Sequence, residues 1–203
     1  MKPTDQQTEQ LTSYAEQGNK SGVELLLKQG IDINGHDTLG RTAVLAAAHG
    51  RQTDLVQYLI EQGADVNIRD NRSDNVLLYS GAEGLLEIVK LALSAHADTR
   101  LTNRYGGTAL IPASERGHVE VVNELLEHSD IQVNHINNLG WTALLEAVIL
   151  SDGGPKHQQI VRKLLAHGAD PSIPDRDGVT ALQHAQARGY KEIERMLIEA
   201  AAK

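Results

Sequence analysis

Cysteine and phenylalanine are absent from the 203-residue chain, which has one tryptophan and five tyrosines. Without cysteine, neither a disulfide framework nor a thiolate metal site can form. A core so poor in aromatic side chains has to be built from Leu, Ile, Val and Ala. Basic residues are also in deficit, with 19 Lys and Arg against 27 Asp and Glu and a net charge of −8. That deficit argues against a general binder of nucleic acid or anionic membrane, because both need an excess of Lys and Arg facing phosphates.

Long apolar runs are missing as well. No stretch approaches the ~20 apolar residues that a membrane-spanning helix needs. The residues from Met1 to Gln7 contain no apolar run of the kind found in a signal peptide. We therefore expect a cytoplasmic protein without a membrane partner, and delivery into another cell by a route without a classical signal stays open.

The chain does contain an internal repeat. A short motif starts with Asp or Asn, has glycine three residues later and threonine five residues later, and recurs along the sequence. Its copies begin at Asp37, Asp70, Asn103, Asn137 and Asp175, and the second copy is degenerate. The threonine positions, with Asn75 in the degenerate copy, are separated by 33, 33, 34 and 38 residues. Apolar pairs at helical spacing and an Ala-Asp segment follow most copies.

A period near 33 residues with this content resembles the ankyrin repeat, over about residues 6 to 200. The resemblance implies an all-α fold, an ankyrin-repeat solenoid of stacked antiparallel helix pairs with protruding β-hairpin loops. We expect a single domain over residues 1–203, with repeats at about 6–36, 37–69, 70–102, 103–136, 137–174 and 175–203. The first helix is largely polar and the last has a polar face, so we expect capping repeats at both ends and a complete array.

Several positions have a readable local role. We expect a side-chain N-cap at the start of the first helix of most repeats, from Thr42, Asn75, Thr108, Thr142 and Thr180. Glycines after the second helix and in the turn should take left-handed conformations. The repeat that begins at Asp70 is the weakest, because Ser73 replaces the turn glycine and Gly81 falls inside a helix. Five extra residues around 151–157 predict a longer connection, either functional or neutral, between the helices of the fifth pair.

Catalytic and metal-binding patterns are not found. The chain has nine histidines, but none is paired with a nucleophile, and His128 and His167 are too far apart to share an ion comfortably. Neither His-Glu-x-x-His nor Gly-x-Ser-x-Gly occurs. We expect no cofactor, no metal site and no enzymatic activity of the protein's own.

The ankyrin resemblance instead implies a concave groove, formed by the hairpin tips and the exposed side of each first helix, that binds a partner protein. Carried over position by position, the groove has seven arginines against four acidic residues, on a chain whose net charge is −8. Trp141 is expected to project from a hairpin tip. The partner-binding residues are expected to be Leu39, Arg41, Arg69, Arg72, Arg104, Tyr105, Arg116, Leu139, Trp141, Ile149 and Leu150.

These features predict a monomeric protein-binding adaptor or regulator whose partner presents an acidic and apolar surface. The alternative is narrower: a dedicated inhibitor or accessory subunit of one enzyme.

Overall fold

The computed structural model describes residues 3–202, which form twelve helices in six successive pairs. The first helices of the pairs are α1 (Pro3–Glu16), α3 (Ala43–His49), α5 (Val76–Glu83), α7 (Leu110–Glu115), α9 (Ala143–Ile149) and α11 (Ala181–Arg188). The second helices are α2 (Lys20–Lys28), α4 (Thr53–Glu61), α6 (Leu86–Ser94), α8 (Val119–His128), α10 (Pro155–Ala166) and α12 (Lys191–Ala201). No helix in residues 3–202 is long and apolar enough to cross a membrane.

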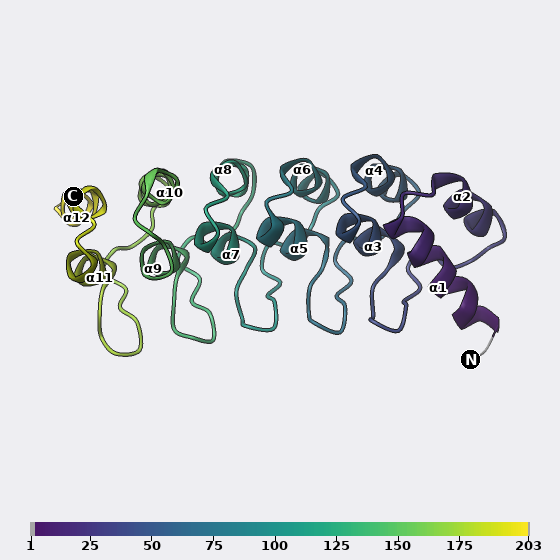
Figure 1. The fold of residues 1–203 in the computed structure, drawn as a ribbon, viewed down its shortest axis with the longest axis horizontal. Coiled ribbons are helices and arrows are strands. Elements are labelled where there is room, and N and C mark those ends of the chain that lie inside the picture. Colours follow the sequence, from purple (N-terminus) through teal and green to yellow (C-terminus); the bar gives the residue numbers. More distant parts are fainter. Residues whose placement is uncertain (1–2, 203) are drawn as a thin grey trace. The chain divides into compact units, whose positions relative to one another are not determined.

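The chain divides into two compact units, and the division falls within α5. The first unit runs to Ser80 and includes residues 85–98, and the second consists of residues 81–84 and the chain from Thr99 onward. In the second unit, α7, α9 and α11 form one layer and α8, α10 and α12 the other (Figure 1). In the first unit, α1 packs on α3, and α4 packs on both α3 and α6.

Each layer meets its neighbours through small and branched aliphatic side chains, as the scarcity of aromatics predicts. In α3 all six residues from Ala43 to Ala48 are buried, and in α9 the apolar residues before Ile149 are buried as well. In the second helices the buried residues recur at helical spacing, for example Val161 and Leu164 in α10. Burying such a side chain contributes about 1.5–3 kcal/mol. Because one helix pair cannot bury these faces alone, neighbouring pairs have to stack.

The loops between pairs project from the layer of first helices (Figure 1). No β-strand is present in the described residues, so the expected β-hairpins are tight turns without a strand ladder. One Asp or Asn closes each turn. At Asn137, the side-chain Oδ1 accepts hydrogen bonds from the N–H groups of Leu139 and Trp141, and the backbone N–H donates to the Trp141 carbonyl at 3.0 Å. The side chain of this Asn or Asp satisfies the polar groups that a strand partner would otherwise satisfy.

The expected N-caps form at four of the five positions. The hydroxyl oxygens of Thr42, Thr142 and Thr180 accept the N–H three residues ahead, and Asn75 Oδ1 accepts the Leu78 N–H at 2.8 Å. The prediction for Thr108 is wrong, because its buried hydroxyl has no hydrogen-bond partner.

The cause is the proline that follows. Pro112 stands where the Thr108 carbonyl would accept its helical N–H, and proline has none. The Ile111 N–H instead bonds the Thr108 carbonyl at 3.2 Å, so it is not free for the hydroxyl, and α7 begins only at Leu110.

The extra residues of the fifth pair form a short loop and lengthen the second helix of the pair. Residues 151–154 lie between the helices, and α10 begins at Pro155, so that it has 12 residues where α8 has 10. The hydroxyl of Tyr190 donates to the Ser151 carbonyl at 2.7 Å, and Gln158 Nε2 donates to the Gly153 carbonyl at 2.8 Å. The insertion is therefore ordered by its neighbours.

The degenerate repeat has two non-glycine residues in left-handed backbone. Ser73 has a φ of 65° where other turns have glycine, and His96 has a φ of 59° after the second helix, where Gly63 and Gly168 stand in other repeats. A side chain in this conformation costs roughly 1–2 kcal/mol. Gly81, in contrast, has a packing role: a Cβ at this position would lie 3.1 Å from the Ala109 Cβ.

Candidate functional site

Neighbouring loop tips in the second unit are joined by hydrogen bonds to backbone carbonyl groups. The Asn138 N–H donates to the Tyr105 carbonyl at 2.9 Å, and a guanidinium nitrogen of Arg176 donates to the Asn138 carbonyl. Asn138 therefore connects the tips that begin at residues 103 and 137 directly, and Arg176 links the tip that begins at residue 175. These three loop tips therefore form a hydrogen-bonded row.

Large apolar side chains on this row are exposed to solvent. Tyr105 is 53% exposed and Leu139 is 49% exposed, and Ile136, just before the second of these turns, is 50% exposed. Arg104 lies over the Tyr105 ring, with its guanidinium carbon 4.5 Å from the ring centroid, and a guanidinium nitrogen donates to the Tyr105 hydroxyl at 2.9 Å. The aromatic ring is thus held in place by its neighbour while one side stays open to solvent.

Trp141 does not lie at the tip. It is half-buried, which corrects the expectation that it projects from the loop. The reason is its position in the turn: its N–H and carbonyl both bond Asn137, and the next residue is the buried cap Thr142. Position 141 is therefore at the base of the loop, and the exposed tip position is two residues earlier, at Leu139.

The first helices contribute the remaining predicted residues of the second unit. On α9, Ile149 is half-buried, and Leu150, which follows the helix, is 48% exposed. Arg116, at the end of α7, donates to the Ala82 carbonyl at 2.8 Å and to Glu83 at 2.7 Å. Part of its charge is therefore compensated within the protein.

The first unit repeats the tip arrangement. The Asn71 N–H donates to the Leu39 carbonyl at 3.0 Å, and Leu39 is 56% exposed. Arg69 and Arg72 are exposed as well. Arg41 is at the base of its turn, as Trp141 is, and its side chain is only 13% exposed. Its guanidinium is bound to Asp37 at 2.8 Å and to Glu16 at 3.1 Å. Arg41 therefore stabilises the loop base and offers a partner little surface.

A buried acid on α9 was not anticipated from the sequence. Glu146 is 5% exposed, and its Oε1 accepts a hydrogen bond from Asn137 Nδ2 at 2.7 Å. Burial, and next the nearby charge of Glu115, raise its pKa to about 7, against the opposing effect of the Asn137 hydrogen bond. The signal was available in the sequence, since Glu146 interrupts an otherwise apolar helix.

Two histidines also have a structural role that the repeat frame did not reveal. His118 Nε2 bonds the Ala82 carbonyl at 3.1 Å, and His157 Nε2 bonds the Glu115 carbonyl at 2.9 Å. Each residue precedes or begins a second helix and ties it to the end of a preceding first helix. The equivalent residue Gln52 bonds the Glu16 carbonyl at the end of α1, and Tyr190 bonds the Ser151 carbonyl in the loop after α9.

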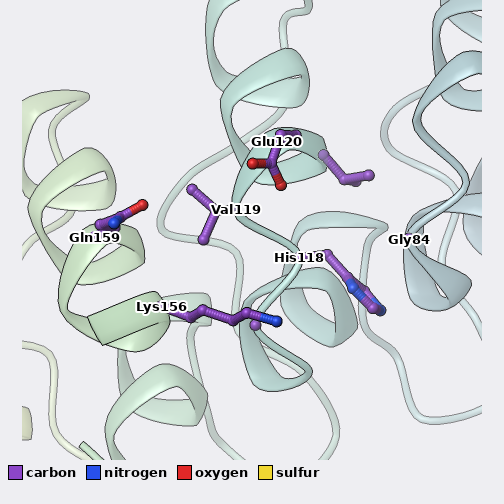
Figure 2. A pocket seen from close by; sticks show the side chains of 8 residues that line it. Gly84, His118, Val119, Glu120, Lys156 and Gln159 are labelled. Atoms are coloured by element: carbon purple, nitrogen blue, oxygen red, sulfur yellow. The ribbon is translucent and has the colours of Figure 1, made fainter. Parts of the chain in front are cut away.

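A cavity of about 330 Å³ lies beside His118. Figure 2 shows Lys156 extending from α10 toward the loop of His118, with Val119 and Glu120 at the start of α8. The cavity is lined by one ammonium and one carboxylate, and the histidine Nε2 is engaged by a carbonyl. No group of three His, Asp or Glu that could hold a metal ion is found in residues 3–202.

Comparison with known proteins agrees with the geometry. A family model described as ankyrin repeats in three copies matches residues 11–97 and 77–175, and another, described as ankyrin repeats in many copies, matches residues 155–198. The crystal structure of the ankyrin repeat domain ABAYE2397 from Acinetobacter baumannii AYE superposes with a TM-score of 0.91. It is 49% identical, and the match covers 94% of this chain and 97% of that one. The ankyrin repeat protein EF0377 gives a TM-score of 0.88 at 39% identity, again covering 94% and 97% of the two chains.

Curated relatives match over shorter segments. The ankyrin repeat protein YahD of Escherichia coli (strain K12) is 53% identical over 81 residues, which are 40% of each chain. The NAD-capped RNA hydrolase NUDT12 of Homo sapiens is 40% identical over 76 residues, which are 37% of this chain and 15% of that protein. Because the matches span two fifths or less of these relatives, the activity named for NUDT12 does not transfer to this chain. The repeat matches extend over residues 11–198, and the chain belongs to the ankyrin-repeat family.

Proposed function

We propose that the protein is a protein-binding adaptor or regulator, and that the row of loop tips in the second unit contacts the partner. The observation that carries this proposal is the pair of exposed apolar side chains, Tyr105 and Leu139, on tips joined by a backbone hydrogen bond. Exposed apolar side chains gathered on a rigid frame are typical of interaction sites. Tyrosine and arginine are also enriched in binding hot spots.

The remaining contacts follow from exposure. Leu150 and the half-buried Ile149 extend the apolar surface onto α9, and Arg104 and Arg116 add positive charge. In the first unit, Leu39, Arg69 and Arg72 provide a similar mixture of apolar and basic groups. A partner with an acidic and apolar surface suits this composition. Trp141 and Arg41 support the loops from their bases and contribute less contact area.

Site-specific photo-crosslinking in cells that produce the protein tests the proposal. A photoreactive amino acid at position 105 should yield a discrete crosslinked protein, and Leu139→Ala should reduce the yield at least tenfold. The control places the same amino acid at Ile198 on α12, which is 49% exposed and therefore as accessible as Leu139. Equal crosslinking from positions 105 and 198, or an unchanged yield after Leu139→Ala, would refute the proposed surface.

The same experiment addresses the narrower alternative. A single enzyme in the crosslinked product, with its activity altered by the purified ankyrin protein, would identify a dedicated inhibitor or accessory subunit. Several unrelated crosslinked proteins would instead indicate an adaptor.

A further inference from the structure

The arginines of the second unit differ in whether a carboxylate balances their charge. On the second helices, Arg162 lies 3.7 Å from Glu192, and Arg195 lies 2.6 Å from the same acid. Arg104 and Arg176, on the loop tips, form no ion pair within the described part of the chain. Their side-chain hydrogen bonds go to a neutral hydroxyl and a neutral carbonyl group instead. The charges of these two tip arginines are therefore available to a partner.

The two tip arginines occupy the same position of the repeat. Each directly follows the Asp or Asn that closes its turn, and Asn138 is the equivalent residue of the repeat between them. In this unit α9 packs on both α7 and α11. Because packed helices lie about 8–10 Å apart, equivalent positions two repeats away are separated by roughly 16–20 Å. The exposed side chain of Leu139 is on the tip between the two arginines, and that of Tyr105 is beside Arg104.

Hydrogen bonds orient both guanidinium groups without saturating them. Arg104 donates to the Tyr105 hydroxyl at 2.9 Å, and Arg176 donates to the Asn138 carbonyl. A Cβ at Gly140 would lie 2.6 Å from Arg176 Cγ, so the aliphatic stem of Arg176 packs against this glycine. A guanidinium has five N–H donors, and each of these bonds uses one of them. The remaining donors can bind both oxygens of a carboxylate, and a side chain that is already held loses less entropy on binding.

The acids of the last loop tip do not occupy these arginines. Asp177 is exposed beside Arg176, but the two form no ion pair within the described residues. Asp175 is bound to His184, with 2.7 Å between the carboxylate and the ring nitrogen. The row of tips therefore has two unpaired cations, Arg104 and Arg176, against the single unpaired acid Asp177.

We propose that Arg104 and Arg176 each bind a carboxylate of one acidic segment of the partner protein, whose apolar residues lie on Tyr105 and Leu139. In an extended segment, which advances about 3.3 Å per residue, the two acidic residues are about five or six positions apart. A protein segment suits the site better than nucleic acid, because the row is partly apolar and the chain has a net charge of −8. This inference rests on the proposed function and specifies how the acidic and apolar groups of the partner are spaced.

Three synthetic peptides of equal length test the inference without the natural partner. The first has two glutamates about six positions apart with leucine and threonine between them, the second has the same two glutamates next to each other, and the third has glutamines in place of the glutamates. The first should bind about five to ten times more tightly than the third at low salt, because two exposed charge pairs add to the apolar contacts. The second reaches only one arginine and should bind less tightly than the first. NMR should show shifts of the Nε–H signals of both arginines with the first peptide, and its advantage should disappear at about 1 M salt, where the screening length is about 3 Å.

Matched variants make the result specific. Arg104→Gln and Arg176→Gln should each remove part of the advantage of the first peptide over the third, and the double variant should remove all of it. Arg162→Gln, on α10 in the other layer of helices, should leave the advantage unchanged. Equal affinity for the two glutamate peptides, an advantage that persists in the double variant, or no binding of the first peptide at millimolar concentration would overturn the inference. Photo-crosslinking from position 105 reports contact with the tips whichever residues the partner presents, so the two proposals can fail separately.

Discussion

Gly50 offers the sharpest test of the packing in the first unit, through the substitution Gly50→Ala. The residue ends α3 with a φ of −74°, which any amino acid can adopt, so the backbone itself does not require glycine. A Cβ at this position would nevertheless lie 1.9 Å from the Glu16 carbonyl oxygen and 2.7 Å from its carbonyl carbon. Other helix pairs have non-glycine residues here, such as Glu83 and Arg116. The requirement therefore comes from the close approach of α1.

The expected loss of stability follows from which atoms have to move in Gly50→Ala. Both clashing atoms belong to the backbone, so the end of α1 must shift away from α3, and overpacking of this kind costs about 1–3 kcal/mol. The shift also breaks the bond from Gln52 Nε2 to the Glu16 carbonyl, which contributes about 1 kcal/mol. We expect Gly50→Ala to reduce the free energy that holds α1 and α2 in place by about 2–4 kcal/mol.

Hydrogen exchange measured residue by residue is the appropriate assay, because repeat arrays lose structure locally. Amides of α1 and α2 should exchange about 30-fold faster or more in Gly50→Ala, while amides of residues 99–202 keep their protection. Gly107→Ala is the control, since a Cβ there meets its nearest neighbour at an ordinary 3.5 Å. If the amides of α1 are as well protected from exchange in Gly50→Ala as in the wild-type protein, the 1.9 Å approach does not constrain position 50 to glycine.

Three further predictions concern the degenerate repeat, the buried acid Glu146 and the loop of Trp141. Ser73→Gly should stabilise the protein by about 0.5–1 kcal/mol, because it relieves a left-handed serine at some cost in unfolded-state entropy. It should also slow amide exchange in residues 70–83, which we expect to exchange faster than the repeat of Thr108 in the wild-type protein. An unchanged urea denaturation curve would contradict this prediction. The raised pKa of Glu146, about 7 in the folded protein against an ordinary 4.5, means that the folded state binds the proton more tightly. Stability should therefore fall as pH rises from 4.5 to 7, by at most about 3 kcal/mol, and Glu146→Gln should flatten this profile in denaturation curves at several pH values. Trp141→Ala should destabilise the protein by about 2 kcal/mol through lost packing, whereas Tyr105→Ala should change the unfolding free energy by less than about 0.5 kcal/mol. Equal changes in unfolding free energy for the two variants would show that the base and the tip of the loop do not differ in burial.

The regular features of this protein could be predicted from the sequence because they are local and repeated. A threonine or asparagine before an apolar run fixes the start of a helix at Thr42, Asn75 and Thr142, and each needs only its own three following residues to do so. The turn glycines likewise take left-handed backbone conformations irrespective of their neighbours. The helix pairs, their order and the apolar face of each follow from this periodicity.

Tertiary structure decided which residues of each loop reach solvent. Leu39 and Leu139 are at the tip, while Arg41 and Trp141, two residues later, return to the helices. The sequence motif does not distinguish these positions, because exposure depends on how far the turn projects before its hydrogen bonds close. The failed cap at Thr108 could have been predicted from Pro112, which removes a donor within the same turn.

Contacts between repeats could be recognised only in three dimensions. His118 and His157 bond carbonyl groups 36 and 42 residues away, and the pKa of Glu146 is raised by burial and by the charge of Glu115 on another helix. A repeating sequence specifies the local structure of each repeat. The partners that a side chain finds on the neighbouring repeat, and therefore its burial and its pKa, depend on how the two repeats pack.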